Sequence, residues 1–126
     1  MVNGEKRQIF VVEDDEAVRG STRALLEAQG FGVREFANAE AFLDATAERC
    51  DADCIVLDHN LAGLSGLDLM LILRAKGVTT PAIMICGNSG PLHDRAAKAG
   101  IRAVLRKPLA ADGLLAWLAE IFPEKQ

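Results

Sequence analysis

The chain has 126 residues, half of them hydrophobic, and its 18 acidic and 14 basic side chains give a formal net charge of -4. This length fits one domain, which we place at residues 1–126 with an ordered core at about 7–122. The charge argues against direct nucleic-acid binding, and no apolar stretch approaches the roughly 18 residues of a membrane span. The three cysteines, Cys50, Cys54 and Cys86, lack the companion ligands of a zinc site and suit a reducing compartment. We therefore expect a cytoplasmic protein without membrane or direct nucleic-acid contact.

Strands and helices alternate along the first half of the chain. Residues 9–12 are continuously apolar, which predicts a strand that is covered on both faces. A helix follows, and Gly30 can end it because glycine readily adopts the left-handed conformation at a helix C-terminus. Residues 33–36 include charged side chains and predict a strand at or near a sheet edge. Apolar residues at i, i+3, i+4 and i+8 then indicate an amphipathic helix, namely Ala39, Phe42, Leu43 and Ala47.

The second half continues this alternation. Residues 54–57 and 82–85 are again continuously apolar and predict central strands, whereas charge interrupts residues 102–106, as expected near an edge. Ser65 is a suitable N-cap for the third helix. Trp117 falls at helical spacing with its apolar neighbours, which predicts packing in the core or on a helix face. We expect the last three helices at residues 67–74, 91–99 and 114–122.

This pattern predicts an α/β fold, a three-layer, doubly wound (βα)5 arrangement around a five-stranded parallel sheet. The working site of such a sheet lies outside the carboxyl ends of its strands. Polar residues follow four of the five apolar runs there. They are Glu13-Asp14-Asp15, Asp58, Cys86-Gly87-Asn88-Ser89 and Lys107-Pro108.

Three carboxylates at one edge of a sheet repel each other, and a hard divalent cation such as Mg²⁺ keeps such a cluster ionised. Since Mg²⁺ takes only one or two direct carboxylates, we expect Asp15 and Asp58 to bind it directly and Asp14 to act through water. A carboxylate can attack phosphorus once the charge on the transferring group is neutralised. Asp58 is the candidate nucleophile, with the cation and Lys107 supplying positive charge.

Three segments in chain order resemble the response regulator receiver domain, and the resemblance covers nearly the whole chain. They are Val11-Val12-Glu13-Asp14-Asp15-Glu16, the stretch at 56–66 that begins Val56-Leu57-Asp58, and Lys107-Pro108. Residues 37–43 also resemble the same segment of receivers that normally precede a helix-turn-helix output domain. The resemblance implies a flavodoxin-like, chemotaxis-regulator-like fold with strand order 2-1-3-4-5.

For the site, the resemblance implies a phosphoacceptor at Asp58 and Mg²⁺ ligation by Asp15, Asp58 and the backbone carbonyl of Asn60, with Asp14 acting through water. Lys107 would pair with the phosphoryl group, and the Lys107-Pro108 peptide bond would be cis. The donor would be a phosphohistidine on a sensor histidine kinase or histidine phosphotransfer protein. The domain would signal rather than act as an enzyme, at most phosphorylating and dephosphorylating itself. With no output segment expected after Gln126, it would bind an unknown downstream protein or drain phosphoryl groups from a relay.

Two residues depart from the family pattern. Cys86 replaces the usual Thr or Ser whose hydroxyl bonds a phosphoryl oxygen, and a thiol is a weaker donor. Val104 replaces the aromatic residue that usually swings inward on the fifth strand. An alternative is therefore a degenerate receiver that binds its partner independently of phosphorylation. A small phosphohydrolase with an aspartyl nucleophile is a third hypothesis, which Asn60 opposes because such enzymes place a second Asp two residues after the nucleophile.

Overall fold

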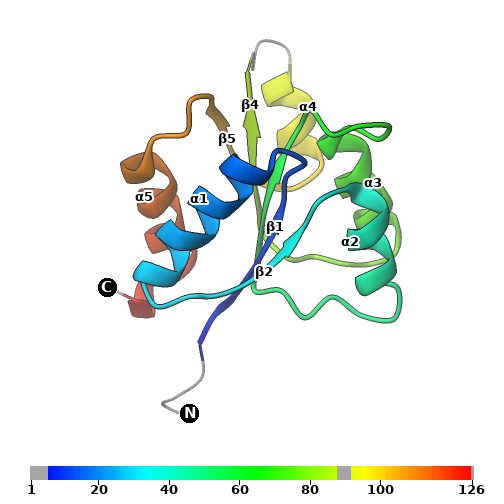
Figure 1. The fold of residues 1–126 in the computed structure, drawn as a ribbon. Helices are drawn as coiled ribbons and strands as arrows, with labels where there is room; N and C mark the ends of the chain where they lie inside the picture. The colour runs from blue at the N-terminus through cyan, green and yellow to red at the C-terminus, as the bar shows by residue number, and fades with distance from the viewer. Residues whose placement is uncertain (1–5, 88–91, 126) are drawn as a thin grey trace.

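The computed structural model describes residues 6–87 and 92–125. Strands and helices alternate along it, and the sheet lies between two helical layers (Figure 1). Helices α1 and α5 cover one face, and α2, α3 and α4 cover the other. In chain order the elements are β1 (Gln8–Val12), α1 (Glu16–Ala28), β2 (Gly32–Phe36), α2 (Ala39–Ala45), β3 (Cys54–Asp58), α3 (Gly66–Ala75), β4 (Ala82–Cys86), α4 (Leu92–Lys98), β5 (Ile101–Arg106), α5 (Ala111–Ile121) and a 3-10 helix, η1 (Pro123–Lys125).

The five strands are parallel and lie in the order β2-β1-β3-β4-β5, which confirms the predicted fold class and strand order. The continuously apolar strands β3 and β4 are central and fully buried, and β1 is buried from Ile9 to Val12. The charge-interrupted strands β2 and β5 form the two edges. Their exposed residues, Arg34 among them, carry the charge that discourages pairing with another chain.

Apolar side chains build a core on each face of the sheet because successive strand residues point to opposite faces. Ile9 and Val11 face the core under α1 and α5, where Leu26, Leu114 and Leu118 pack. Alternate residues of the same strands face the core under α2, α3 and α4. Asp58 ends β3 between these two cores and is therefore held by buried backbone.

Side-chain caps define where three helices begin. Asp15, Asn38 and Ser65 each accept a hydrogen bond from the backbone N–H three residues later, at the starts of α1, α2 and α3. Gly30 follows α1 with a φ of 91°, a conformation that favours glycine. The caps predicted at Ser65 and Gly30 are thus confirmed.

Several predicted helix boundaries need adjustment, and the largest difference is at α5, which begins at Ala111 instead of residue 114. Helix α2 ends at Ala45, so Ala47 lies outside it, and the Thr46 hydroxyl bonds the carbonyl of Phe42 at the helix end. Helix α4 runs from Leu92 to Lys98, inside the predicted range of 91–99. Asn88 and Ser89, two of the polar residues predicted to follow the fourth strand, lie outside the described residues, as does Pro91.

Trp117 is 37% exposed, so of the two predicted placements, in the core or on a helix face, the structure shows the helix face. Helix α5 lies against the sheet through a narrow stripe in which Leu114 and Leu118 are buried. Residue 117 is turned about 100° from residue 118 around the helix axis and lies beyond that stripe. The apolar residues of α5 extend around the helix beyond the stripe that packs against the sheet.

The C-terminal end contacts the N-terminal segment after α5, where η1 follows. Glu124 accepts a hydrogen bond from the Arg7 guanidinium at 2.6 Å, and this guanidinium also lies over the Phe122 ring. These contacts join the two ends of the described chain. Among residues 6–87 and 92–125, no helix has the length and apolar character needed to cross a bilayer.

Candidate functional site

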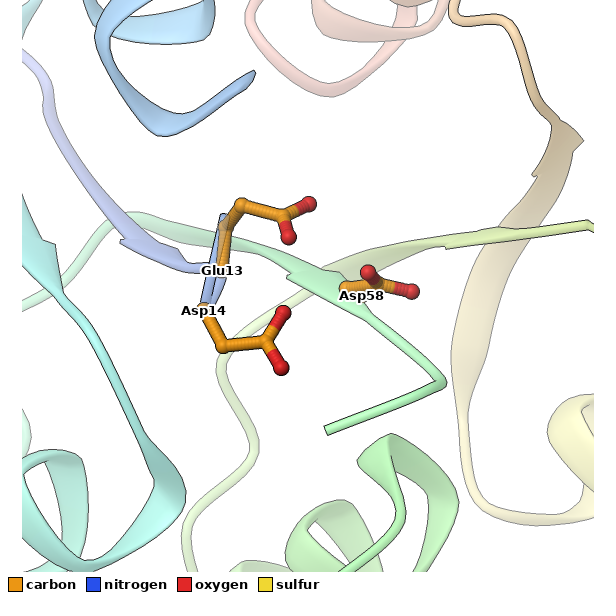
Figure 2. Close-up of side chains that lie close together, drawn as sticks. All are labelled: Glu13, Asp14 and Asp58. Atoms are coloured by element: carbon orange, nitrogen blue, oxygen red, sulfur yellow. The ribbon is translucent and has the colours of Figure 1, made fainter. Parts of the chain in front are cut away.

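Three carboxylates converge where β1 and β3 end. The ladder pairs Val12 with Leu57, so the residues after β1 lie beside Asp58 at the same edge of the sheet. Carboxylate oxygens of Glu13, Asp14 and Asp58 all lie within 4.8 Å of one another, and Figure 2 shows the three side chains close together at the ends of the two strands. Asp58 is 2% exposed and Glu13 4% exposed, whereas Asp14 is open to solvent.

Asp15, the predicted direct metal ligand, is not part of this cluster. Its carboxylate accepts the Val18 backbone N–H at 3.0 Å and so caps α1. Its own N–H donates to Glu13 Oε2 at 3.1 Å. The structure therefore places Glu13, which the sequence argument left out of the ligand set, where Asp15 was expected.

The sequence itself contains a signal that Asp15 caps α1 and is not part of the cluster. Strand β1 ends at Val12 and α1 begins at Glu16, so the connection is three residues long. An aspartate directly before a helix is a preferred N-cap, because its oxygen satisfies a backbone N–H of the first turn. That preference assigns Asp15 to the helix and leaves the first two acids of the run to the cluster.

Lys107 directly follows β5, and its side chain reaches Asp58. Its Nζ lies 2.7 Å from Asp58 Oδ2, and this hydrogen bond is the main cause that raises the pKa of Lys107. The backbone N–H of Lys107 donates to the carbonyl of Cys86 at 2.9 Å, which ties the residue to the end of β4. The Lys107–Pro108 peptide bond is cis, as the resemblance implied. The lysine thus supplies a positive charge at Asp58, the one buried aspartate in the part of the chain that the structure describes.

The loop after Asp58 is held closely against α3. The Asn60 N–H donates to Asp58 Oδ1 at 2.9 Å, and the Gly66 N–H donates to the His59 carbonyl at 2.8 Å. A Cβ at Gly66 would lie only 2.5 Å from the carbonyl oxygen of Asp58, so this approach requires glycine. Asn60 itself is exposed and lines the cavity beside the cluster.

Burial is the main cause that raises the pKa of Glu13, to about 7. The N–H of Asp15 opposes this shift and the negative charge of Asp58 adds to it. A buried carboxyl beside a second carboxylate favours either a proton or a cation. The possible ligand atoms are carboxylate oxygens, and Asp14 is exposed to solvent. Both features fit Mg²⁺, a hard cation that binds oxygen ligands and keeps several waters.

A cavity of about 530 Å³ opens from the cluster. Its polar end is formed by the three carboxylates and Lys107. Its walls are the face of α1 that carries Val18 and the connection between β5 and α5 at Pro108 and Leu109. Asp58, although 2% exposed, therefore lines a cavity at the protein surface.

The two atypical residues occupy the positions expected of them. Cys86 ends β4 and is 1% exposed, beside the strand that carries Asp58. Val104 lies on β5 opposite Met84 and is half-buried. A small aliphatic side chain at Val104 has no ring that could turn between an exposed and a buried position.

Known proteins resemble the chain over most of its length. The response regulator receiver domain family matches residues 9–119. Transcriptional regulatory protein FixJ of Azorhizobium caulinodans is 38% identical over 113 residues, 89% of this chain and 53% of FixJ. Sensory/regulatory protein RpfC of Xanthomonas campestris pv. campestris is 38% identical over 119 residues, 90% of this chain and 16% of RpfC. The chain spans about half the length of the FixJ relative.

Solved structures show the same fold. A CheY-like response regulator receiver domain protein from Methanospirillum hungatei matches with a TM-score of 0.86 at 24% identity, covering 96% of this chain and 97% of that one. A CheY-like receiver domain from Methylobacillus flagellatus matches with a TM-score of 0.82 at 28% identity, covering 93% and 99%.

Proposed function

Because the chain belongs to the response regulator receiver domain family of two-component signalling, we propose that Asp58 accepts a phosphoryl group with Mg²⁺ bound beside it. The observation that carries this proposal is the buried Asp58 carboxylate, which lies 2.7 Å from Lys107 and within 4.8 Å of two further carboxylates. Receiver domains bind Mg²⁺ in such an acidic pocket.

The ligand set follows the observed cluster. Asp14, Asp58 and the backbone carbonyl of Asn60 would hold the cation directly, and Glu13 would act through water. Asp15 would keep its place as the cap of α1. Bound Mg²⁺ would neutralise charge on the transferring group and on the acids around it.

The transfer itself needs positioning more than proton chemistry. An Asp58 oxygen attacks phosphorus while the bond from phosphorus to the donor nitrogen breaks, and the imidazole leaves with that electron pair. The Asn60 N–H holds Asp58 Oδ1, which fixes the orientation of the carboxylate. The Lys107 ammonium pairs with the oxygens of the arriving group. The product is an aspartyl phosphate.

The donor class is a phosphohistidine on a sensor histidine kinase or a histidine phosphotransfer protein. The cavity beside Asp58, with apolar walls at Val18, Pro108 and Leu109, is open to a side chain of that donor. We propose that the loaded domain then binds a downstream protein or passes its phosphoryl group into a relay, as a signalling domain rather than an enzyme.

Phosphotransfer tests the assignment. Acetyl phosphate with Mg²⁺ is expected to label the protein, as seen by intact mass, and chelation of Mg²⁺ is expected to prevent labelling. Asp58→Asn should abolish the label. Asp51→Asn is the matched control, because Asp51 is exposed and lies before β3, at the opposite end of that strand from Asp58. Unchanged labelling of Asp58→Asn would overturn the proposal.

The residues at Cys86 and Val104 favour a second candidate, a receiver that binds its partner whether or not it is phosphorylated. A thiol is a weak donor to a phosphoryl oxygen, and Val104 has no ring to move. Beryllofluoride, a phosphoryl mimic, should then change amide chemical shifts around Asp58 but not along α4 and β5. Shifts that extend across α4 and β5 in the wild type would exclude this candidate.

A further inference from the structure

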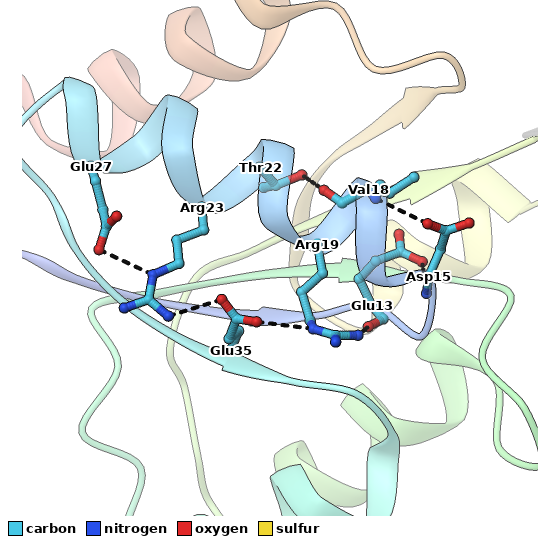
Figure 3. Close-up of polar contacts among 8 residues, drawn as sticks. All are labelled: Glu13, Asp15, Val18, Arg19, Thr22, Arg23, Glu27 and Glu35. Carbon is cyan, nitrogen blue, oxygen red and sulfur yellow. Dashed lines mark hydrogen bonds and ion pairs between the residues drawn. The ribbon is translucent and has the colours of Figure 1, made fainter.

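Two arginines of α1 converge on one carboxylate of β2. Arg19 and Arg23 lie one turn apart, and their guanidinium groups donate to the two oxygens of Glu35 at 3.0 and 2.9 Å (Figure 3). Arg23 also pairs with Glu27 on the same helix at 3.1 Å. Arg23 and then Arg19 are the main causes that lower the pKa of Glu35. The result is a fixed anchor between α1 and the edge strand.

Arg19 makes one contact that Arg23 does not. Its Nη1 donates to the backbone carbonyl of Glu13 at 2.8 Å, and its side chain is only 14% exposed. The N–H of Glu13 donates to the carbonyl of Phe36 at 3.0 Å. The peptide groups on both sides of Glu13 are therefore held, one by β2 and one by Arg19, which Glu35 in turn orients.

The hydrogen bonds to the Glu13 backbone hold the β1–α1 turn, which carries two of the three acids of the cluster. Glu13 and Asp14 lie beside Asp58, and mutual repulsion of the three carboxylates favours moving the turn away from the sheet. A guanidinium bound to a backbone carbonyl opposes that movement without occupying a carboxylate oxygen. The oxygens stay available to a cation.

We propose that Arg19 is a positioning residue that holds the β1–α1 turn in the conformation that binds the divalent cation. The inference rests on the proposed function, since the cation belongs to that site. Arg19 acts through the Glu13 backbone and touches neither the cation nor the phosphoryl group.

The sign of the effect separates positioning from simple electrostatics. Arg19 carries a positive charge near the cluster, so its removal by charge alone would strengthen cation binding. Loss of positioning would weaken it. Groups that orient metal ligands typically change metal affinity by roughly 10- to 100-fold when they are removed.

The experiment compares Arg19→Gln with Arg23→Gln by titration calorimetry of Mg²⁺. Both variants lose one positive charge and one bond to Glu35, and only the first loses the bond to the Glu13 carbonyl. Arg19→Gln should bind Mg²⁺ roughly tenfold more weakly than wild type, and Arg23→Gln should stay within about twofold, the size expected of an exposed ion pair. Equal affinities in the two variants, or tighter binding by Arg19→Gln, would overturn the inference.

A second measurement needs no cation. Amide hydrogen exchange at Glu13 to Asp15 in the metal-free protein should be faster in Arg19→Gln than in Arg23→Gln. Arg19→Lys should lie between wild type and Arg19→Gln in both assays, because one ammonium cannot donate to both partners with the geometry of a guanidinium. It also provides the test if Arg19→Gln does not fold, and an Arg19→Lys variant equal to wild type in both assays would overturn the inference.

The two proposals fail separately. Wild type that binds no Mg²⁺ contradicts the proposed function, while the exchange measurement still decides whether Arg19 holds the turn. Wild type that binds Mg²⁺ and is labelled at Asp58, with no effect specific to Arg19→Gln, contradicts the positioning role alone.

Discussion

Substitution of consecutive acids distinguishes the two possible ligand sets. Asp14→Asn and Asp15→Asn make the same chemical change at neighbouring positions, but only Asp14 lies in the cluster with Asp58. Asparagine is as good an N-cap as aspartate, so Asp15→Asn keeps the cap of α1. Any difference in Mg²⁺ affinity between the variants therefore reports on the cation site.

The expected magnitude follows from the spacing of the carboxylates. A cation among oxygens that lie within 4.8 Å of one another interacts with each carboxylate at no greater distance than that. With the dielectric constant of water, a charge of +2 and one carboxylate at this separation gain about 1.7 kcal/mol, or roughly 20-fold in affinity. The Asp14 variant should lose at least this much. The Asp15 variant should lose less than about threefold, because it removes only a screened charge outside the cluster.

Calorimetric titration of Mg²⁺ into each variant measures the difference, and labelling with acetyl phosphate at low Mg²⁺ gives an independent check. Thermal unfolding without the cation shows whether both variants remain folded. An Asp15→Asn variant that loses as much affinity as Asp14→Asn would refute the assignment and restore Asp15 as a ligand.

Three further predictions concern the acceptor loop, the thiol and acid stability. Gly66→Ala should destabilise the protein by about 1–3 kcal/mol in urea unfolding, because the added Cβ overpacks against the Asp58 carbonyl; wild-type stability would contradict the close approach. Cys86→Thr should bind beryllofluoride more tightly by up to about tenfold, the value of an ordinary hydrogen bond, when followed by fluorine NMR; unchanged affinity would show that the residue does not reach the phosphoryl group. The folded-state pKa of Glu35 is lowered from 4.5, so its contribution to stability is present above pH 4.5 and is lost as the pH falls through the folded pKa. Unfolding measured against pH should therefore show the advantage of wild type over Glu35→Gln shrinking in acid, and a gap that is constant with pH would contradict it.

Much of the fold follows from local sequence patterns. Continuous apolar runs mark β1, β3 and β4 as buried strands, and interrupted runs mark β2 and β5 as edges, because a strand covered on both faces consists mainly of apolar residues. Asp58 and Lys107 follow such runs directly, so their meeting could be predicted from the common edge of a parallel sheet.

The environment of single side chains could not be predicted in the same way. The apolar pattern of α5 does not reveal how far the helix overlaps the sheet, so it left open whether Trp117 lies in the core or, as the structure shows, on a partly exposed helix face. The contacts of Arg19 with Glu35 and Glu13 join α1 to β2 and to the end of β1, and no local spacing encodes them.

The acidic run after β1 has one feature that the sequence determines and one that depends on the tertiary structure. The sequence by itself determined that carboxylates would gather at this edge of the sheet around Asp58, because strand ends follow from burial patterns. The preference for aspartate at a helix N-cap favours Asp15 as the cap of α1, whereas only the tertiary structure decided that both Glu13 and Asp14 face Asp58. The physical reason is that residues 13–15 connect β1 to α1, so neither strand nor helix periodicity sets their side-chain directions. The end of the β1–β3 pairing at Val12 and the start of α1 at Glu16 set them instead.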